Sequence, residues 1–517
     1  MPQAYEVHPY TIAALLRLMA ERAGSDSYTI EQKRHRIYLE EYFAHLNTQT
    51  IIVEADYTDR DFLEDFAGYY VRCFNEYPRR CTRLHFFDLA FAEINFTALL
   101  AAEPSPLTPE RLQSAYLGFL VIKPLPQTFI GRTCLRTYSN DPRRFYPITR
   151  TYEANLFGLQ LTVESLAYQE QDSVAAACAT SALWSAFHGT GKQFQHAIPS
   201  PVEITRAATA HAALGTRTFP NSNGLRLEQM ADAIRSVGLE PYMVGVSDQW
   251  VLRSTLYAYL RGQIPVLLGI ELYDPDAPVN PNTGRQFPLA LHAITAAGYS
   301  LEPHIPIVYS NSGFALKAFR MDKIYAHDDQ VGPFARMEFL HSAHFSTYHL
   351  LGQGTRNAAA FAFFLLIPLY HKIRIPFLSI FNIVSSFSSR IEQLQQGSNL
   401  VLSAPLEWDI YLTAVNPLKA ELQQMTTLSG EYRRSVLTQP MPRFLWRATA
   451  LIDDVPVLDL LFDATDIEQG RSFVGVIKHD VVLGQILSQV AQVFVMSGMT
   501  YGRPDRHVIE WLAKPAF

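Results

Sequence analysis

The stretch "QEQDSVAAACATSALWSAF" (residues 169–187) places one cysteine, Cys178, among small residues just where an apolar helix is expected to begin. Cysteine is among the most frequently buried residue types, so one interpretation is a core cysteine that fills space in a tightly packed helix. The other interpretation is a nucleophile, because the partial positive charge at a helix amino terminus favours the thiolate. Small neighbours would also let a substrate backbone approach closely. Residues elsewhere in the chain decide between the two.

The chain is long and rich in apolar residues. Its 517 residues exceed what one hydrophobic core normally holds, so several domains are expected. Hydrophobic residues make up 48% and charged residues 18%, a composition typical of a folded protein and not of a disordered one. The net charge of −6 gives no electrostatic basis for binding nucleic acid through a general basic surface.

Cysteine spacing and apolar segments indicate the cellular setting. The four cysteines are scattered and form no CxxC pair, which argues against a disulfide framework or a zinc site and favours a reducing, cytoplasmic setting. The amino-terminal stretch contains Arg17 and Arg22 within an amphipathic helix pattern, unlike a signal peptide. The apolar run from Ala358 to Tyr370 is shorter than the ~20 residues of a membrane helix. We therefore expect a buried strand or core helix there, and no membrane span.

Patterns along the chain predict mixed secondary structure in closely packed domains. Apolar residues at helical spacing predict a helix over 225–238 that Gly238 ends, and 264–272 and 289–300 are typical of strands. Residues 319–337 predict a strand, a turn and a second strand. We expect three domains, of which the first and last have no recognised role: 1–160, 161–350 and 351–517.

Two later segments carry the partners that a cysteine nucleophile needs. Such enzymes use a histidine that accepts the thiol proton and a polar side chain that orients the histidine. His292 opens an apolar strand in "LALHAITAAGYS", although a single histidine there is more often a core residue. Asp328 and Asp329 end a strand in "KIYAHDDQVGP", where carboxylates are often plain turn residues. The order and placement of the three groups together favour the nucleophile interpretation.

With these residues in this order, residues 165–340 resemble the papain-like cysteine peptidases, and among them the bacterial double-glycine (bacteriocin-processing) type. The cysteine segment of that family corresponds to "QDSVAAACATSAL", its histidine segment to "HAITAAGY" and its acid segment to "HDDQVG". Between them, "NGLRLEQMADAIRSVGLEPYMV" and "LRGQIPVLLGI" match the helix and strand units of the family. The resemblance covers roughly a third of the chain.

The resemblance implies a fold and an activity. The fold would be α+β: a papain-like core, in which the helix carrying the cysteine packs on an antiparallel sheet carrying the histidine and the acid, flanked by additional α/β domains. The activity would be that of a thiol protease, a hydrolase of peptide or isopeptide bonds in which Cys178 attacks the carbonyl, His292 transfers the proton and Asp328 orients His292. No cofactor or metal is implied. The substrate would be a protein or peptide, and the flanking regions would offer surface to a partner protein.

The oxyanion donor departs from the family pattern. Asp172 stands where the family has the glutamine that stabilises the oxyanion, so Gln171 is expected in that role, with Gln169 as the alternative. Together with the Cys178 backbone N–H, such a donor is typically worth ~3 kcal/mol of transition-state stabilisation. Ala179 also replaces the glycine that usually follows the cysteine.

The orienting acid is similarly open. Asp329 replaces the proline that usually follows the acid, so Asp328 is the first candidate, Asp329 the second and Asn311 in "YSNSG" the third. None of these departures touches the thiol and imidazole themselves.

Two other functions stay open. On the same fold, a transglutaminase-like enzyme or acyltransferase would pass the acyl group to an acceptor other than water, and an amine acceptor would then raise turnover. A catalytically inactive papain-like module would instead bind a protein in a signalling or defence assembly. The unusual Ala177-Cys178-Ala179 context favours that reading, and such a module has no need of a reactive thiol.

Two weaker signals are expected to be structural. In "HSAHFSTYH", His341 and His344 could share a helix face as metal ligands, but no acid or cysteine completes the set, so these two and His349 are expected to be surface or loop histidines. Gly131-Arg132 in "FIGRTCLR" could hold a phosphate or carboxylate, and an edge-strand arginine is the simpler expectation.

Overall fold

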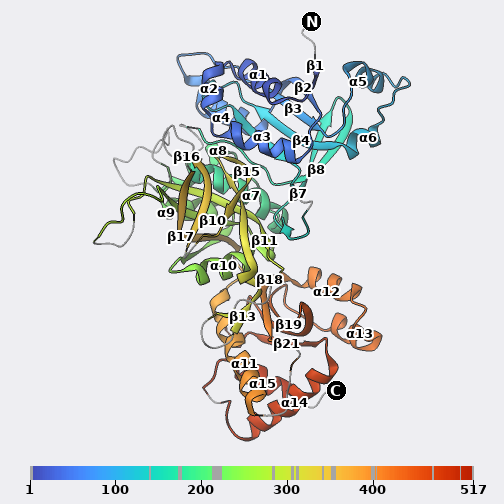
Figure 1. Ribbon diagram of the computed structural model, residues 1–517, viewed down its shortest axis with the longest axis vertical. Coiled ribbons are helices and arrows are strands. Elements are labelled where there is room, and N and C mark those ends of the chain that lie inside the picture. Colours follow the sequence, from blue (N-terminus) through green and yellow to red (C-terminus); the bar gives the residue numbers. More distant parts are fainter. Residues whose placement is uncertain are drawn as a thin grey trace. The chain divides into compact units, whose positions relative to one another are not determined.

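A computed structural model gives the fold of the chain (Figure 1). Asn311 and His341 lie outside the residues that it describes. The described residues are 4–138, 141–172, 177–211, 224–281, 286–303, 308–309, 314–340, 343–350, 357–397, 402, 404–468, 471–500 and 502–514.

The chain forms two compact units, each assembled from three segments. Unit 1 comprises Met1–Gln249, Ile264–Ser300 and Lys323–Pro368. Unit 2 comprises Trp250–Gln263, Leu301–Asp322 and Leu369–Phe517. The three domains expected at 1–160, 161–350 and 351–517 stay a prediction.

Unit 1 contains a five-stranded antiparallel sheet near the amino terminus. The strand order is β1-β2-β3-β4-β5, which leaves β5 at an edge. The strands are β1 (Tyr5–Pro9), β2 (Thr50–Tyr57), β3 (Cys81–Phe87), β4 (Tyr116–Ile122) and β5 (Ile130–Leu135). The helices of this region are α1 (Ile12–Ala23), α2 (Ser27–Gln32), α3 (His35–His45), α4 (Arg60–Gly68), η1 (Tyr70–Arg72), α5 (Glu93–Leu100) and α6 (Pro109–Ser114). A hairpin of β7 (Arg150–Leu156) and β8 (Leu159–Ser165) follows.

The second sheet of unit 1 has eight strands. Its main order is β15-β14-β11-β10-β17-β16, with β6 paired to β11 and β9 to β17. The strands are β6 (Arg144–Phe145), β9 (Leu239–Gly245), β10 (Val266–Tyr273), β11 (Ala290–Leu301), β14 (Met321–Asp328), β15 (Gly332–Glu338), β16 (His344–Leu350) and β17 (Asn357–Tyr370). The helices are α7 (Cys178–Phe194), α8 (Pro201–Ala208) and α9 (Leu227–Ser236). The apolar run 358–370 is therefore a strand inside a sheet, as one of the two expectations had it.

Helix α7 packs with this second sheet. Buried α7 residues, Leu183 and Phe187 among them, share one hydrophobic core with Leu267 of β10, Ala293 of β11 and Leu366 of β17. Burying one such side chain contributes roughly 1.5–3 kcal/mol, so this core holds the amino-terminal end of α7 against β11.

A glycine lets a further strand join the second sheet. A Cβ on Gly298 of β11 would lie 2.6 Å from the Phe145 carbonyl oxygen. The neighbouring Tyr299 stacks on Phe145 with ring centroids 5.2 Å apart. The Gly-Tyr pair of the histidine segment thus has a packing reason in this chain.

Unit 2 is built on a six-stranded sheet in the order β12-β13-β18-β19-β20-β21. These are β12 (Val308–Tyr309), β13 (Phe314–Leu316), β18 (Glu407–Ala414), β19 (Phe444–Ile452), β20 (Val455–Asp463) and β21 (Phe473–Lys478). The helices are α10 (Gln249–Arg261), η2 (Lys317–Arg320), α11 (Phe377–Gly397), α12 (Val415–Gln424), α13 (Gly430–Thr438), α14 (Val481–Met496) and α15 (Arg506–Leu512). Buried Asp459 pairs with Arg447 and His479, each at 2.9 Å.

Most of the expected elements are confirmed. The chain combines helices with sheets that are antiparallel except for the parallel pair β13 and β18, in line with the α+β class. The predicted helix at 225–238 is α9, and the strands predicted at 264–272, 289–300 and 319–337 are β10, β11, and β14 with β15. The helix considered for the histidine-rich segment is wrong, because its described residues form strand β16.

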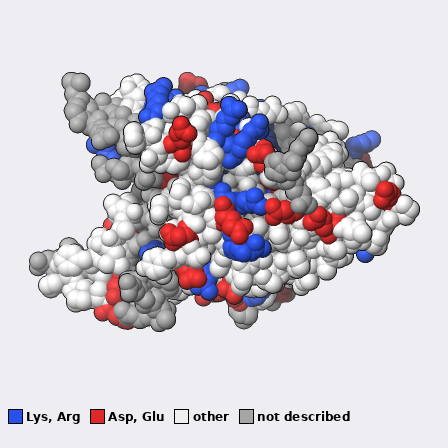
Figure 2. Space-filling model, turned by 90° about the horizontal axis from the view of Figure 1, so that it is seen from above, with Lys and Arg blue, Asp and Glu red and all other residues white. Residues whose placement is uncertain are grey.

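Two further expectations concern a membrane span and a general basic surface. Of the helices in the described residues, not one combines the length and apolar character that a bilayer crossing requires. On the face shown in Figure 2, acidic and basic side chains of the described residues lie interspersed among uncharged ones.

Candidate active site

Cys178 is the first residue of α7 and is half-buried. The residue before it, Ala177, has an extended backbone and offers no side-chain acceptor to the first turn of the helix. An alanine at this position leaves the backbone N–H groups of that turn without the side-chain cap that a serine or aspartate would supply. Cys178 lines a cavity of about 590 Å³. The thiol therefore lies at a helix start that is open to a ligand.

His292 and Asp328 meet beside this thiol. His292 lies in β11 and Asp328 is the last residue of the neighbouring strand β14. The His292 Nε2 atom lies 2.9 Å from Asp328 Oδ1, and the Cys178 thiol is hydrogen-bonded to the same imidazole. Because Nε2 faces the carboxylate, Nδ1 is the ring nitrogen left for the sulfur. The structure thus brings the three predicted residues together in the order thiol, imidazole, carboxylate.

The two buried partners support each other's charge. Burial disfavours the protonated His292 ring, but the carboxylates of Asp328 and Asp329 and the thiol outweigh it and raise the His292 pKa well above its usual value. Burial likewise opposes ionisation of Asp328, yet His349 and His292 hold the pKa of that carboxyl well below its usual range.

Asp329 is a second carboxyl at this site, with a different environment. Its Oδ1 lies 3.5 Å from His292 Nε2, and the side chain lines the cavity while only 3% exposed. Neither of its carboxylate oxygens has a hydrogen-bond partner. Burial, partly offset by His292, raises the pKa of Asp329 to about 7. Of the two adjacent acids, Asp328 therefore makes the orienting hydrogen bond.

His349 is a site residue that the sequence reasoning missed. It was expected on the surface or in a loop, and that expectation is wrong: His349 is 1% exposed, and its Nε2 lies 2.7 Å from Asp328 Oδ2. The signal was the strand period of two in "HFSTYHL", which turns Phe345, Thr347 and His349 inward and leaves His344 half-buried.

The His292, Asp328 and His349 side chains lie close enough together to be considered as metal ligands, since their ligand atoms are within 4.8 Å of one another. However, both histidine Nε2 atoms already face Asp328, one at each carboxylate oxygen. A metal ion bound to these nitrogen atoms would replace both hydrogen bonds to Asp328. His292 would then lose the contact that orients its ring toward the Cys178 thiol. We therefore interpret the cluster as a hydrogen-bonded chain.

The candidates for the oxyanion donor differ in position. Gln171 lines the cavity together with Cys178, as does Asp172. Gln169 is buried and is not among the described residues that line it, and its amide nitrogen has no hydrogen-bond partner. The segment before Gln171 is held by β5, since the Glu170 N–H donates to the Ile130 carbonyl at 3.0 Å. Position favours Gln171, whose role stays a prediction.

Arg132 is used within the fold. It lies on the edge strand β5, and its guanidinium contacts Asp61 at 2.6 Å and Asp59 at 3.7 Å. The carboxylates that this arginine binds are therefore those of the chain itself, as expected of an edge-strand arginine.

Comparisons with models of known protein families and with curated proteins find no match for this chain. The resemblance to papain-like peptidases therefore stays a prediction, to be judged by the chemistry of the site.

Proposed function

We propose that the protein is a cysteine peptidase or related thiol hydrolase, with a papain-like core, that cleaves peptide or isopeptide bonds. The observation that carries the proposal is the position of His292 between the Cys178 thiol and the Asp328 carboxylate, at a cavity. A thiol, an imidazole and a carboxylate in this order are the groups that nucleophilic catalysis by cysteine requires. A buried structural cysteine would need neither the imidazole nor access to a cavity.

The chemistry follows from the positions of these groups. The Cys178 thiolate attacks the carbonyl carbon of the substrate, and His292 then protonates the leaving amine, which leaves an acyl group on the sulfur. Water, deprotonated by His292, releases the acyl group and restores the thiol. Backbone N–H groups at the start of α7, with Gln171, would bind the oxyanion.

The test is the pH dependence of Cys178 alkylation by iodoacetamide, followed by mass spectrometry of the labelled peptide. In the wild-type protein we expect alkylation at pH 6 to be at least roughly tenfold faster than in His292→Ala, because a free thiol with a pKa of ~8.5 is almost fully protonated there. His45 is exposed, so His45→Ala is the matched control, and its Cys178 should be alkylated as fast as that of the wild type.

Other thiols provide an internal reference. Burial raises the pKa of Cys134 to about 12 and also raises that of Cys81, so both should stay unlabelled in the folded protein. A Cys178 that is inert, or that reacts equally in His292→Ala, contradicts the proposal and favours the binding module. If Cys178 reacts and an added amine raises the turnover of an acyl donor, acyl transfer is favoured over hydrolysis.

A further inference from the structure

Three consecutive residues near the amino terminus, Lys33, Arg34 and His35, all contact the candidate active site. They form the connection from α2 into α3 and line the Cys178 cavity. Lys33 forms an ion pair with Glu170, which precedes Gln171. The His35 Nε2 atom lies 3.0 Å from the Asp329 carbonyl oxygen and 2.8 Å from the Tyr168 hydroxyl. A segment outside the stretch that resembles a peptidase therefore reaches the reacting groups.

Arg34 makes the contact with the clearest chemical consequence. Its terminal nitrogen NH1 lies 2.7 Å from Nδ1 of His349. A guanidinium only donates hydrogen bonds and does not lose its proton in proteins, so Nδ1 must accept. The ring hydrogen of His349 is then on Nε2, which lies 2.7 Å from Asp328 Oδ2 and donates to it. Arg34 thus selects the tautomer of His349 that Asp328 needs.

Asp328 receives donors on both carboxylate oxygens. Oδ2 accepts from His349, while Oδ1 accepts from His292 at 2.9 Å and from the Gln330 backbone N–H at 3.1 Å. Hydrogen bonds to the ionised form favour ionisation and fix the orientation of the carboxylate. The ionisable groups that face this cluster are His292 from β11, Asp329 from the turn after β14, Arg34 and His35 from the start of α3, and Glu170 from the segment before α7.

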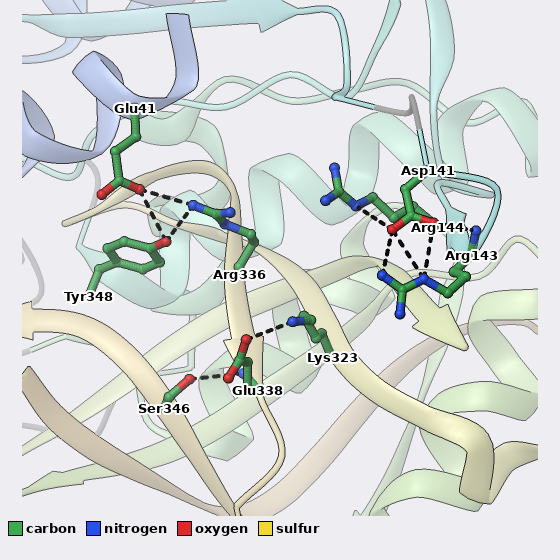
Figure 3. A network of polar contacts seen from close by, with 9 residues as sticks. All are labelled: Glu41, Asp141, Arg143, Arg144, Lys323, Arg336, Glu338, Ser346 and Tyr348. Atoms are coloured by element: carbon green, nitrogen blue, oxygen red, sulfur yellow. Dashed lines mark hydrogen bonds and ion pairs between the residues drawn. The ribbon is translucent and has the colours of Figure 1, made fainter. Parts of the chain in front are cut away.

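A second set of contacts holds α3 in place for this role. Figure 3 shows Glu41 of α3 beside Arg336 of β15 and Tyr348 of β16. Arg336 donates to Glu41 at 2.9 Å and to the Tyr348 hydroxyl at 2.8 Å, and that hydroxyl lies 3.4 Å from Glu41. Tyr348 is next to His349 in β16. The helix that follows Arg34 is therefore attached to the strand on which His349 lies.

We propose that Arg34 is a positioning residue of the active site: it fixes the form of His349 that donates to Asp328, and Asp328 in turn holds His292 toward Cys178. The inference rests on the proposed function of Cys178, His292 and Asp328. Its consequence is that the amino-terminal region completes the catalytic centre instead of only flanking it.

The test compares Cys178 alkylation at pH 6 in a set of variants. Cys178 in Arg34→Ala and in His349→Phe should react about tenfold more slowly than in the wild type. His349→Phe removes the hydrogen bond to the Asp328 carboxylate, and Arg34→Ala leaves the His349 ring without a fixed donor nitrogen for it. Arg36→Ala removes the same charge two positions further along the chain, at a residue that does not line the Cys178 cavity, and its Cys178 should react as that of the wild type does.

A double variant separates the proposed route from a general effect of charge. A glutamine amide at position 349 can donate to Asp328 without a tautomer to select, so His349→Gln should stay within about twofold of the wild type. In that background Arg34→Ala should have little further effect, because coupled residues are not additive. Wild-type reactivity in Arg34→Ala, or an equal tenfold loss in both backgrounds, overturns the proposal.

A second measurement does not depend on reactivity. With ¹⁵N-labelled histidine, the neutral His349 ring, assigned by its loss in His349→Gln, should be the Nε2–H tautomer at pH 8 in the wild type and a mixture of the two tautomers in Arg34→Ala. A wild-type Nδ1–H tautomer at pH 8 overturns the role of Arg34. Cys178 alkylation that does not depend on His292 overturns the proposed function instead, so the two failures are distinguishable.

Discussion

Asp329 is a buried carboxyl next to a catalytic candidate, and its two oxygens have no hydrogen-bond partner. Its pKa of about 7 in the folded protein lies above the ~3.9 of an unfolded aspartate. A carboxyl with such a raised pKa does not lower the free energy of unfolding below about pH 4. It lowers this free energy increasingly as the pH rises toward 7, and by a constant amount above that. Asp329→Asn should therefore raise the free energy of unfolding by a few kcal/mol at pH 8 and by very little at pH 4.

Urea unfolding at the two pH values measures this difference. Glu153→Gln is the matched control, because it removes an exposed carboxylate from the β7–β8 hairpin and should change stability equally little at both. An Asp329→Asn protein that is less stable than the wild type at pH 8 would show that the carboxylate is stabilised by its site, contrary to the expectation.

At the same scale, the sequence allowed part of the site to be predicted. Cys178, His292 and Asp328 each belong to a local pattern, a helix start or the end of a strand, and the structure brings them together. Arg34 and His349 could not be found in that way, because the role of each depends on the other across 315 positions. A basic residue before a helix is ordinary, and a histidine on the inner face of a strand is most simply a core residue.

Among the elements, the turn between β14 and β15 links the acid to α3. Gly332, at the start of β15, has a φ of +156°, and a Cβ there would lie 2.3 Å from the Tyr38 ring of α3. Tyr38 also donates to the Pro333 carbonyl at 2.7 Å. Gly332→Ala should destabilise the protein by roughly 1–3 kcal/mol and displace the turn that carries Asp328 and Asp329. We expect thermal unfolding at a lower temperature and slower Cys178 alkylation at pH 6.

The β7–β8 hairpin supplies the control for backbone strain alone. Gly158 has a φ of +92°, and a Cβ there would meet nothing within 4 Å. Gly158→Ala should therefore destabilise the fold while Cys178 alkylation stays as in the wild type. Equal loss of alkylation in both variants would mean that the turn after β14 has no special link to the site.

Elements with strong local signals were predictable, and elements whose signals are ambiguous were not. Helix α9 has apolar residues at helical spacing and Gly238 at its end, so its own residues define it. Strand β16 carries threonine, tyrosine and two histidines, and its period of two does not show which side is covered until the strand pairs with β17. Tertiary contacts therefore decide β16, whereas propensity and periodicity suffice for α9.

For the whole molecule, the first 160 residues contribute to a site whose proposed nucleophile, Cys178, lies beyond them. They contain Arg34 and the edge strand β5, which exchanges backbone hydrogen bonds between Thr133 and Tyr168 at 2.7 and 2.9 Å. A chain beginning at residue 161 should lose these supports and leave buried apolar surface exposed. We expect it to bind the dye ANS and to lack fast Cys178 alkylation at pH 6.

The full-length Cys178→Ser protein is the control for dye binding, since it should fold and bind as little ANS as the wild type. A shortened chain that folds and keeps alkylation dependent on His292 would show that residues 161–517 form the catalytic centre without help. That result would also argue against the positioning role of Arg34.

The separation between Arg34 and His349 has a consequence during synthesis. Because 315 positions divide the two residues, a ribosome adding about 5–20 residues per second needs between roughly 15 seconds and a minute to produce the second after the first. Cys178 is made partway through that interval and His292 later, so for the last 171 residues of it the chain carries the thiol before the strand that steadies the acid. A growing chain would thus carry the proposed nucleophile for about a third of its synthesis before the contacts of its acid are complete, so that reactivity toward neighbouring nascent proteins would be delayed until then.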